Sequence, residues 1–478
     1  MAVAIVLLLG QTLPWLGNRW VEDESWQCIP TYTLLTEGRI RNPTHAETDW
    51  EYTVCAKPVG QTLLLVPFFK WLGVGVRQAR LPSVLFGAGL IILTYLLGRR
   101  LIDGNCGVLA AFLLATDNWA FLAARTARPD MYTAFFAAAA VLMYLRMRQT
   151  GSVRDGLLTG LAIGAVMNFH PNGVPVAASI GLFSLLEWRS RIFRQPPLWA
   201  LALGVLSLVL PFWLWGHHTP QHAKAWHDTY HLTDSWSWAV RIAGERTRYS
   251  DFIGIANLRI PSVIPLPARA HIAAILLASL VVLFRKKRPV AIMISILLVA
   301  HMLWFVYLVN KTGRYFVSLA PFLAIAIAGM ACMKYDRKIF HHLALGCALL
   351  VGLTQLTGNL ILLQKSRDAD YLEVASQLRS LIPPGKSVYA GGTFWMALYD
   401  HPFSSYHRVK FDYALAKRKP DYLVLNDRVM VKGMGWGIDD WKDLREQSNA
   451  YAQEHGKLAG RVSSRFYGDM DVYELSYP

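Results

Sequence analysis

The sequence has 478 residues, of which 54% are hydrophobic and only 17% are charged, and its mean hydropathy is +0.29. This composition excludes an ordinary soluble protein of two or three domains and indicates lipid as the main solvent of the chain. The net charge of +16 does not indicate a nucleic-acid-binding protein, because the basic residues neither follow one amphipathic face nor alternate with aromatic residues expected to be exposed. We therefore expect an integral membrane protein and no nucleic-acid partner.

The basic residues fall in short clusters between apolar segments, and the clusters occur in every second loop. They are Arg99 and Arg100; Arg146, Arg148 and Arg154; Arg189, Arg191 and Arg194; residues 285–288; and Lys334, Arg337 and Lys338. This alternation follows the positive-inside rule, by which Lys and Arg accumulate in cytoplasmic loops. It predicts the orientation of each helix between two clusters.

Taken in chain order, apolar segments close to the ~20 residues that cross a bilayer predict about eleven transmembrane helices. The first segment, residues 1–17, lacks the basic start and the small-residue cleavage site of a signal peptide, so we interpret it as a retained helix. The others are expected near residues 80–98, 105–122, 131–145, 155–170, 173–187, 197–215, 268–284, 289–309, 315–333 and 340–363.

Two long segments, about 18–79 and 216–266, are expected on the outer face. The first begins with an acidic loop over residues 18–58, and the segment 60–73 that follows is predicted to be an interfacial helix. Cys28 and Cys55 both fall in that loop, so a disulfide and two free thiols are the alternatives there. The second segment is predicted to contain an interfacial helix rather than a zinc site built from histidines four residues apart. Those histidines are His217, His218, His222, His227 and His231.

From residue 364 the composition becomes that of a soluble domain. A helical pattern begins at Tyr371, and short strands are predicted at 387–390 and 422–426. A hairpin is predicted around Gly468-Asp469. These elements predict a small α/β domain over residues 364–478, placed on the outer face and appended to a transmembrane domain over residues 1–363.

Several charged residues are candidates for chemistry at the outer face. Glu22, Asp23 and Glu24 follow the first helix within about six residues and are therefore held at the membrane surface. A carboxylate there can deprotonate an acceptor hydroxyl or amine as it attacks a sugar carbon, and solvated surface charge is the alternative. Lys57 closes the same loop and is interpreted either as a phosphate contact or as a lysine that reaches the interface from the following helix.

A second group of candidates lies where helices meet at the outer face. Arg128 and Asp130 contradict the usual charge bias of that face, so they either pair with each other or line a cavity. Arg314-Tyr315 begins a late span, and His170 lies in an outer turn. Arg314-Tyr315 is interpreted either as part of the site or as an anchor at the helix end. His170 is interpreted either as a site residue or as an ordinary turn residue.

Together these landmarks resemble the GT-C superfamily of glycosyltransferases. Within it they resemble the glycosyltransferase 39-type branch, which includes protein O-mannosyltransferases and lipid A aminoarabinose transferases. The resemblance covers the whole membrane region. Its most specific stretches are Arg80-Leu-Pro-Ser83, Tyr95-Leu-Leu-Gly-Arg-Arg100 and Ala127-Arg128-Pro129-Asp130.

The resemblance implies roles for particular residues. It implies that Asp23 is the catalytic base, supported by Glu24. The substrate-contacting residues that it implies, together with the charge pattern above, are Lys57, Arg128, Asp130, His170, Arg314 and Tyr315. It also implies a polyprenyl-phosphate-linked sugar as donor, a lipid, glycan or protein as acceptor, and transfer with inversion at the outer leaflet of a bacterial inner membrane.

We therefore predict a polytopic, GT-C-like membrane glycosyltransferase that carries a small C-terminal α/β domain on the outer face. A lipid or solute transporter is the alternative, because it also needs many spans and intramembrane charges. The sequence shows neither the repeated halves nor the interrupted helices common in transporters. No cofactor is assigned, and dependence on a divalent metal stays open.

Overall fold

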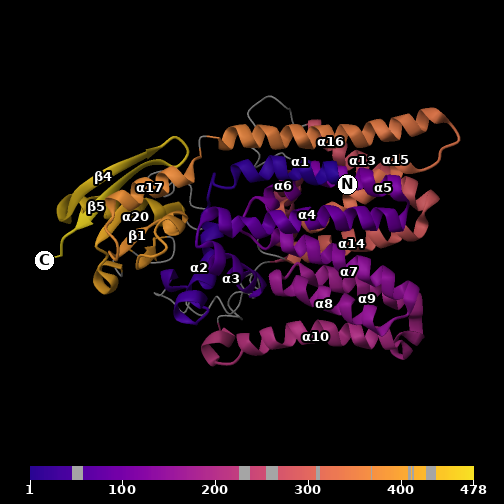
Figure 1. The fold of residues 1–478 in the computed structure, drawn as a ribbon, viewed down its shortest axis with the longest axis horizontal. Coiled ribbons are helices and arrows are strands. Elements are labelled where there is room, and N and C mark those ends of the chain that lie inside the picture. The colour runs from indigo at the N-terminus through magenta and orange to yellow at the C-terminus, as the bar shows by residue number, and fades with distance from the viewer. Residues whose placement is uncertain are drawn as a thin grey trace.

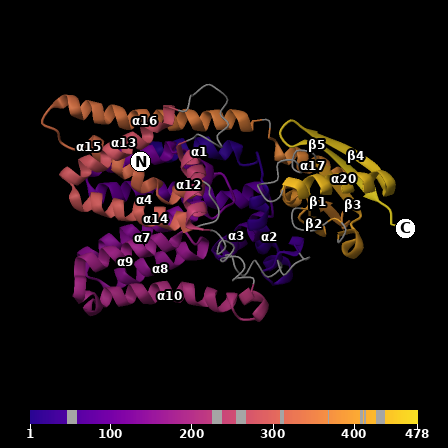
Figure 2. The same cartoon turned by 180° about the vertical axis from the view of Figure 1, so that it is seen from behind.

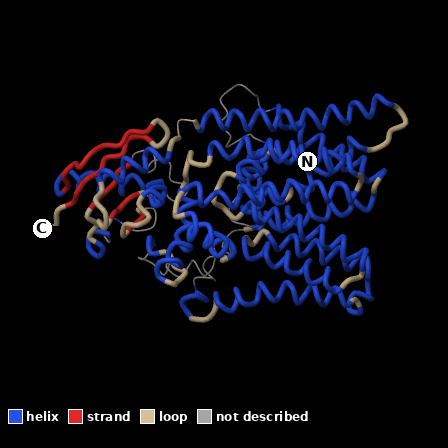
Figure 3. The backbone as a smooth tube through the Cα atoms, viewed as in Figure 1, coloured by secondary structure: helices blue, strands red, loops and turns tan. Residues whose placement is uncertain are grey.

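In a computed structural model, long helices form a bundle with a sheet-containing domain at one end (Figure 1). The structure describes residues 1–45, 58–224, 237–253, 267–307, 313–367, 369–406, 411, 414–426 and 438–477. Within them, all the strands that are drawn lie in the C-terminal domain, and the rest is helix and loop (Figure 3). The predicted order of a helical membrane region followed by an α/β domain is therefore observed.

The helices of the bundle lie side by side and coincide with the apolar segments of the sequence (Figure 1). They are α1 (Ala2–Thr12), α4 (Val76–Leu101), α5 (Gly104–Thr116), α6 (Asn118–Ala124), α7 (Asp130–Thr150), α8 (Val153–Phe169), α9 (Gly173–Trp188), α10 (Pro196–Gly216), α13 (Pro267–Lys286), α14 (Arg288–Tyr307), α15 (Ala320–Cys332) and α16 (Lys338–Ser366). Small residues bring some of them very close together: a Cβ at Gly160 of α8 would lie 2.0 Å from the carbonyl oxygen of Leu201 in α10.

The predicted number of eleven spans is not confirmed. Four described helices are long and apolar enough to cross a bilayer, namely Val76–Leu101, Pro196–Gly216, Arg288–Tyr307 and Lys338–Gln364, and a bent pair raises the number to five. Others fall short because they are brief: α8 has 17 residues and α9 has 16. An apolar run in the sequence therefore marked each helix of the bundle, but only some of the described helices reach the length of a full span by themselves.

One predicted span is interrupted, which the sequence analysis did not anticipate. The segment expected at 105–122 consists of α5 and α6, bent by 64° at Asp117. The Asp117 carboxylate accepts a hydrogen bond from the Ala120 amide at 2.8 Å and so caps α6. Carbonyl groups at the end of α5 are satisfied by side chains: Asn359 donates to the Thr116 carbonyl at 3.0 Å, and Gln11 donates to the Ala115 carbonyl at 3.3 Å.

The first outer segment is mostly helical rather than a loop. It contains α2 (Glu22–Glu37) and α3 (Gly60–Leu72), and both lie between the bundle and the C-terminal domain in Figures 1 and 2. Helix α3 matches the segment predicted to be interfacial. Lys57 and Cys55 lie outside the described residues, and with them the alternative of a disulfide to Cys28. The second outer segment contributes α12 (Trp238–Ile253).

The C-terminal domain is built on a five-stranded sheet in the order β2-β1-β3-β5-β4. The strands are β1 (Val388–Ala390), β2 (Phe403–Ser405), β3 (Tyr422–Asn426), β4 (Gly456–Ser464) and β5 (Gly468–Leu475). Strand β1 pairs in parallel with β2 and β3, whereas β5 is antiparallel to β3 and β4. The strands predicted near 387–390 and 422–426 and the hairpin around Gly468 are all present.

Helices cover both faces of this sheet. Val388 and Val424 face α17 (Tyr371–Leu381), and the alternate residues Tyr389 and Leu425 face α20 (Ile438–His455), as the two-residue period of a strand requires. The face with α17 belongs to the same buried cluster as residues 20, 65 and 69 of the membrane region. The domain and the start of α2 therefore share one hydrophobic core.

Candidate active site

The three consecutive acids predicted as chemistry-bearing occupy the first turn of α2. Glu22, Asp23 and Glu24 follow the extended residue Val21, so their carboxylates lie near the positive end of the helix dipole. A helix start fixes their directions relative to one another, whereas the loop expected from the sequence would not. Asp23 and Glu24 point into different surroundings.

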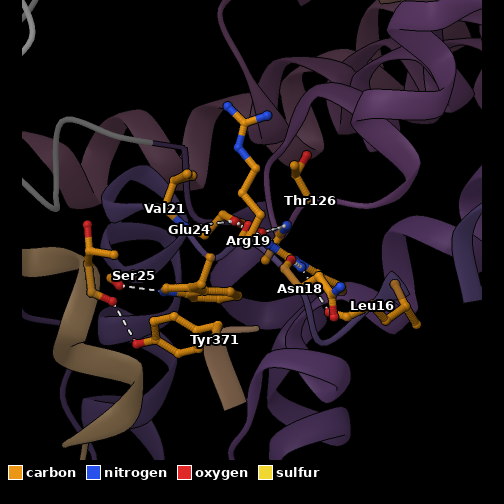
Figure 4. A network of polar contacts seen from close by, with 12 residues as sticks. Leu16, Asn18, Arg19, Val21, Glu24, Ser25, Thr126 and Tyr371 are labelled. Atoms are coloured by element: carbon orange, nitrogen blue, oxygen red, sulfur yellow. Dashed lines mark hydrogen bonds and ion pairs between the residues drawn. The ribbon is translucent and has the colours of Figure 1, made fainter. Parts of the chain in front are cut away.

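Glu24 is fully buried and forms a bidentate ion pair with Arg80 of α4. Both pairs of atoms, Arg80 Nε with Glu24 Oε1 and Arg80 Nη2 with Glu24 Oε2, are 2.7 Å apart, and the two side chains are 1% and 0% exposed. The remaining guanidinium hydrogens go to backbone carbonyls before α2. Figure 4 draws the residues that carry these carbonyls, Leu16, Asn18 and Arg19, beside Glu24. Those acceptors are the carbonyls of Leu16, Asn18 and Arg19, at 2.8, 2.6 and 2.7 Å.

Glu24 also joins α2 to the loop before α7. Its Oε1 accepts a hydrogen bond from the Ala127 amide at 2.8 Å, and its Oε2 accepts one from the Val21 amide at 3.3 Å. Ala127 directly precedes Arg128, just as Glu24 directly follows Asp23. The buried Arg80–Glu24 pair therefore fixes the backbone next to Asp23 and next to Arg128, which form a second, more exposed ion pair.

Asp23 lies between two arginines. Its Oδ2 contacts Nη1 of Arg128 directly and is 3.2 Å from Nη1 of Arg314. On its other side Arg128 donates from Nε to Oδ2 of Asp130 at 3.0 Å. The Asp23 side chain is 25% exposed and that of Arg314 is 30% exposed, so both are accessible to a ligand.

The Arg128 guanidinium is held as a cation. Burial lowers its pKa, but the adjacent Asp23 and Asp130 carboxylates outweigh burial and raise the pKa of Arg128 above its ordinary value. Arg125, three residues earlier, packs over the Phe121 ring at 5.2 Å instead. Burial and the nearby Arg80 lower the pKa of Arg125 to about 9. Asp23, Arg128, Asp130 and Arg314 together form the centre of the candidate site.

His170 and Tyr315 flank this group. Their ring centroids are 5.0 Å apart, and the Asn172 amide donates to His170 Nδ1 at 3.1 Å. Burial lowers the pKa of His170 to about 4, and the nearby arginines act in the same direction. His170 is therefore neutral at pH 7, with its proton on Nε2. Burial raises the pKa of Tyr315, so its hydroxyl stays protonated.

The lowered pKa of His170 predicts a loss of stability in mild acid. Between pH 6.5 and about 4 the unfolded chain binds a proton at this ring and the folded chain does not, so lower pH favours unfolding. The full effect is at most about 3 kcal/mol, and the partly exposed ring reduces it. Thermal midpoints measured from pH 7 to pH 4.5 should fall less steeply for His170→Gln than for the wild type; parallel curves would contradict the prediction.

An open apolar groove of about 800 Å³ begins close to this group. It runs between α9 and the pair α13 and α14, and its lining includes Ala178, Leu182, Ser295, Ala300, Leu303 and Trp304. Trp304 donates from its indole nitrogen to the Asn172 side chain at 3.2 Å, which connects this part of the groove to the turn that carries His170. Its lining is apolar, as in sites that hold hydrocarbon chains.

The described residues include no group of three or more His, Cys, Asp or Glu side chains placed to hold an ion. Asp23 and Asp130 both bond to Arg128, which lies between their carboxylates. His217 stacks on Trp213 at 4.6 Å, and His227 and His231 lie outside the described residues.

The structure thus brings together Asp23, Arg128, Asp130, Arg314, His170 and Tyr315, and separates Glu24 from them. Lys57 lies outside the described residues. Arg80 was noted in the sequence only as part of a motif, yet it is the partner of Glu24. The signal for it is an arginine inside an apolar helix, since such a charge is buried only with a partner.

Comparison with known proteins agrees with this architecture. Residues 56–215 match the family model described as dolichyl-phosphate-mannose-protein mannosyltransferase. That match includes Arg80, Arg128, Asp130 and His170, but neither Asp23 nor Arg314. No curated protein sequence matches the chain significantly.

Solved structures match over nearly the whole chain. ArnT from Cupriavidus metallidurans, bound to undecaprenyl phosphate, gives a TM-score of 0.66 at 16% identity, covering 99% of this chain and 96% of that one. The oligosaccharyltransferase of Archaeoglobus fulgidus in its apo form gives 0.59 at 12% identity, covering 99% and 74%. The archaeal oligosaccharyltransferase AglB from Archaeoglobus fulgidus, in complex with an inhibitory peptide and a dolichol-phosphate, gives 0.57 at 12% identity, covering 99% and 74%.

The chain therefore has the fold of the GT-C membrane glycosyltransferases. The resemblance to the GT-C superfamily that its motifs indicated is confirmed. The chain is similar both to the dolichyl-phosphate-mannose-protein mannosyltransferase family model and to ArnT.

Proposed function

We propose that the protein is a membrane glycosyltransferase that moves a sugar from a polyprenyl-phosphate donor to an acceptor at the outer face of the membrane. The observation that carries the proposal is the Asp23 carboxylate between Arg128 and Arg314, accessible and close to an apolar groove. Such a reaction needs a base, cations that bind a phosphate, and a binding groove for a lipid tail. The GT-C fold, and relatives solved with undecaprenyl phosphate and dolichol-phosphate, support the same donor class.

The distribution of basic residues supports the outer-face assignment. The turns that join α9 to α10 and α15 to α16 lie at the end of the bundle away from the sheet (Figure 1). The first of these turns contains the helix Arg189–Arg194, which includes three arginines, and Lys334 and Arg337 lie in the second. By the positive-inside rule that end is cytoplasmic, so the site and the C-terminal domain face outward.

In the proposed complex the prenyl chain of the donor lies in the groove between α9 and α14. Its phosphate binds Arg314 and Arg128, and Lys57 is proposed to contribute a further cation. His170 offers its Nε2 proton to a phosphate or sugar oxygen, because its Nδ1 already accepts from the Asn172 amide. Embedding the site in the membrane brings a lipid donor and a water-side acceptor together without extracting the lipid.

Donor binding activates Asp23 in this mechanism. A carboxylate between two guanidinium groups is a weak base, because both cations stabilise its charged form. The donor phosphate competes for Arg128 and Arg314 and returns basicity to Asp23. Asp23 then takes the proton from the acceptor hydroxyl or amine while that atom bonds to the anomeric carbon. The bond from carbon to phosphate oxygen breaks, and the arginines stabilise the polyprenyl phosphate that leaves.

One observation favours the transporter alternative, namely the interrupted span at Asp117, since broken helices often form substrate sites in transporters. Against it, most of the polar groups described at this break are bonded within the protein: the Asn118 side-chain nitrogen donates to the Gln355 carbonyl at 2.7 Å and contacts Asn359, although the Asn118 side-chain oxygen has no partner. A break filled in this way stabilises a bend. We therefore keep transport as the second candidate.

A transfer assay tests the proposed function. Purified protein in proteoliposomes is given a panel of polyprenyl-phosphate sugars, each with a labelled sugar, together with membrane extract as a source of acceptors. Movement of label into an acceptor is expected for one donor. If no donor supports transfer while the protein moves a labelled lipid between leaflets, the transporter candidate replaces the proposal.

The groove gives a further prediction. Ala178→Trp places an indole in the groove, so the KM for the donor should rise about tenfold, because the prenyl chain loses part of its binding surface, while kcat changes little. Leu353→Trp is the matched control, because Leu353 is 57% exposed on α16 and does not line the groove. Equal KM values for both variants would count against tail binding in this groove.

A further inference from the structure

The start of α2 is held from two sides. Arg80 of the bundle bonds to the chain on one side, and the C-terminal domain bonds to it on the other. On the domain side, the Arg19 amide donates to the Ala369 carbonyl at 2.8 Å, and Asn18 forms an isolated β-bridge with Asp370. These contacts lie within a few residues of the catalytic candidate Asp23.

Trp20 is the residue on which the two sides meet. It is fully buried, its indole nitrogen donates to the Ser25 hydroxyl at 2.8 Å, and its ring lies 6.2 Å from that of Tyr371. The Arg80 guanidinium lies over the same ring at 5.2 Å. Trp20 therefore contacts both the ion pair that anchors Glu24 and the domain.

Arg19 has an unusual backbone conformation at this junction. Its φ is +49°, a left-handed conformation that non-glycine residues rarely adopt. Such a conformation persists only where its surroundings determine it. Here Arg80 binds the Arg19 carbonyl, and the Arg19 guanidinium lies over the Phe466 ring of the domain at 5.6 Å.

Tyr467 contributes a side-chain hydrogen bond from the domain to this segment. It lies in the turn between β4 and β5, is 4% exposed, and donates from its hydroxyl to the Trp20 carbonyl at 3.0 Å. Its ring packs against Tyr371 at 5.8 Å and Phe394 at 6.2 Å, which holds the hydroxyl in place. Strands β4 and β5 thereby reach from the far end of the chain to the segment that carries the acids.

We propose that the C-terminal domain is a working part of the catalytic centre, with Tyr467 as a positioning residue that holds Trp20 and, through it, the first turn of α2. The inference rests on the proposed role of Asp23 as base. Without the hydroxyl, the Trp20 carbonyl loses its donor, and the strained turn before α2 can relax. Asp23 then moves relative to Arg128 and to the acceptor, and displacements of this kind reduce turnover strongly.

The test compares two variants of the full-length protein in proteoliposomes. Tyr467→Phe removes the hydroxyl that contacts Trp20. Tyr477→Phe is the matched control, because its hydroxyl also donates to a backbone carbonyl, that of Pro420 at 2.7 Å, but within the domain. Both variants should lose a similar amount of thermal stability. Only Tyr467→Phe should show a kcat about tenfold lower, with an unchanged KM for the donor.

Hydrogen exchange gives a second measurement that does not depend on activity. The amides of residues 20–25 should exchange at least about tenfold faster in Tyr467→Phe than in wild type or Tyr477→Phe, because their segment is released. Unchanged exchange, or faster exchange with an unchanged kcat, would overturn the inference. If the wild type transfers no sugar from any donor, the proposed function fails. The exchange measurement stays independent of that result, because unchanged exchange of residues 20–25 in Tyr467→Phe would by itself refute the coupling of Tyr467 to this segment.

Discussion

Asp23→Asn should reduce kcat for sugar transfer by about 10²- to 10⁴-fold, the range expected when a general base is removed. Asn keeps the size and hydrogen-bonding capacity of the side chain, but it cannot accept the proton of the acceptor. The measurement is transfer of labelled sugar in proteoliposomes, compared with wild type at equal amounts of folded protein. Turnover within a factor of three of wild type would eliminate Asp23 as the base.

The same variant should bind the lipid phosphate at least as well as wild type. In the proposed mechanism the Asp23 carboxylate competes with the donor phosphate for Arg128 and Arg314, and Asn does not compete in this way. Undecaprenyl phosphate is a suitable probe of binding. A lower kcat with an equal or lower KM separates this mechanism from simple damage to the site, which would raise KM.

Glu22→Gln is the matched control for this experiment. It removes a carboxylate from the same first turn of α2, and therefore has the same effect on the helix dipole. A Cβ added at Gly392 of the C-terminal domain would lie 2.8 Å from Glu22 Cγ, so this side chain faces the domain. Transfer by Glu22→Gln should stay within a few-fold of wild type; an equal loss in both variants would mean that helix stability, rather than base catalysis, explains the effect.

Glu24→Gln should destabilise the protein by about 3 to 5 kcal/mol, because it leaves the Arg80 guanidinium buried without a counter-charge. The expected consequence is a markedly lower thermal midpoint in detergent and lower yield of folded protein. Arg379→Gln is a suitable control, because its ion pair with Asp400 is 38% and 45% exposed and contributes under about 1 kcal/mol. A thermal midpoint equal to that of the control would show that the buried pair is not an anchor.

A double variant refines this prediction. Replacing both Arg80 and Glu24 by Met removes the uncompensated charge, so part of the lost stability should return. The recovery should be incomplete, because three carbonyl groups and the Ala127 amide then lose their partners. Thermal unfolding of Arg80→Met, Glu24→Met and the double variant, each compared with wild type, gives the coupling free energy.

The sequence alone was enough to predict the general architecture. Apolar run length located the helices of the bundle, and the two-residue period and turn residues located β1, β3 and the β4–β5 hairpin, because these signals are local. The number of full spans is not confirmed, since run length does not show where a helix ends or bends. The break at Asp117 depends on side chains from α1 and α16 that lie more than 100 residues away in sequence.

The candidate site was predictable in composition but not in arrangement. Charges on the side of the membrane poor in positive charge singled out Asp23, Arg128, Asp130 and Arg314, because such residues persist there only when paired or functional. Their mutual distances depend on how helices distant in sequence pack. Sequence therefore grouped Asp23 and Glu24 as one acidic pair, whereas the structure gives them separate surroundings.

What the sequence by itself determined is the solvent of the chain, the order of its two parts, and the residue types available at the outer face, all of which follow from composition and short-range periodicity. What only the tertiary structure decided is which charges meet. Arg80 reaches Glu24 across 56 residues, and Tyr467 reaches Trp20 across 447, so both contacts exist only once the bundle and the C-terminal domain have packed around the start of α2. The buried carboxylate became an anchor and its exposed neighbour a candidate base, because burial permits a charge only where partners satisfy it.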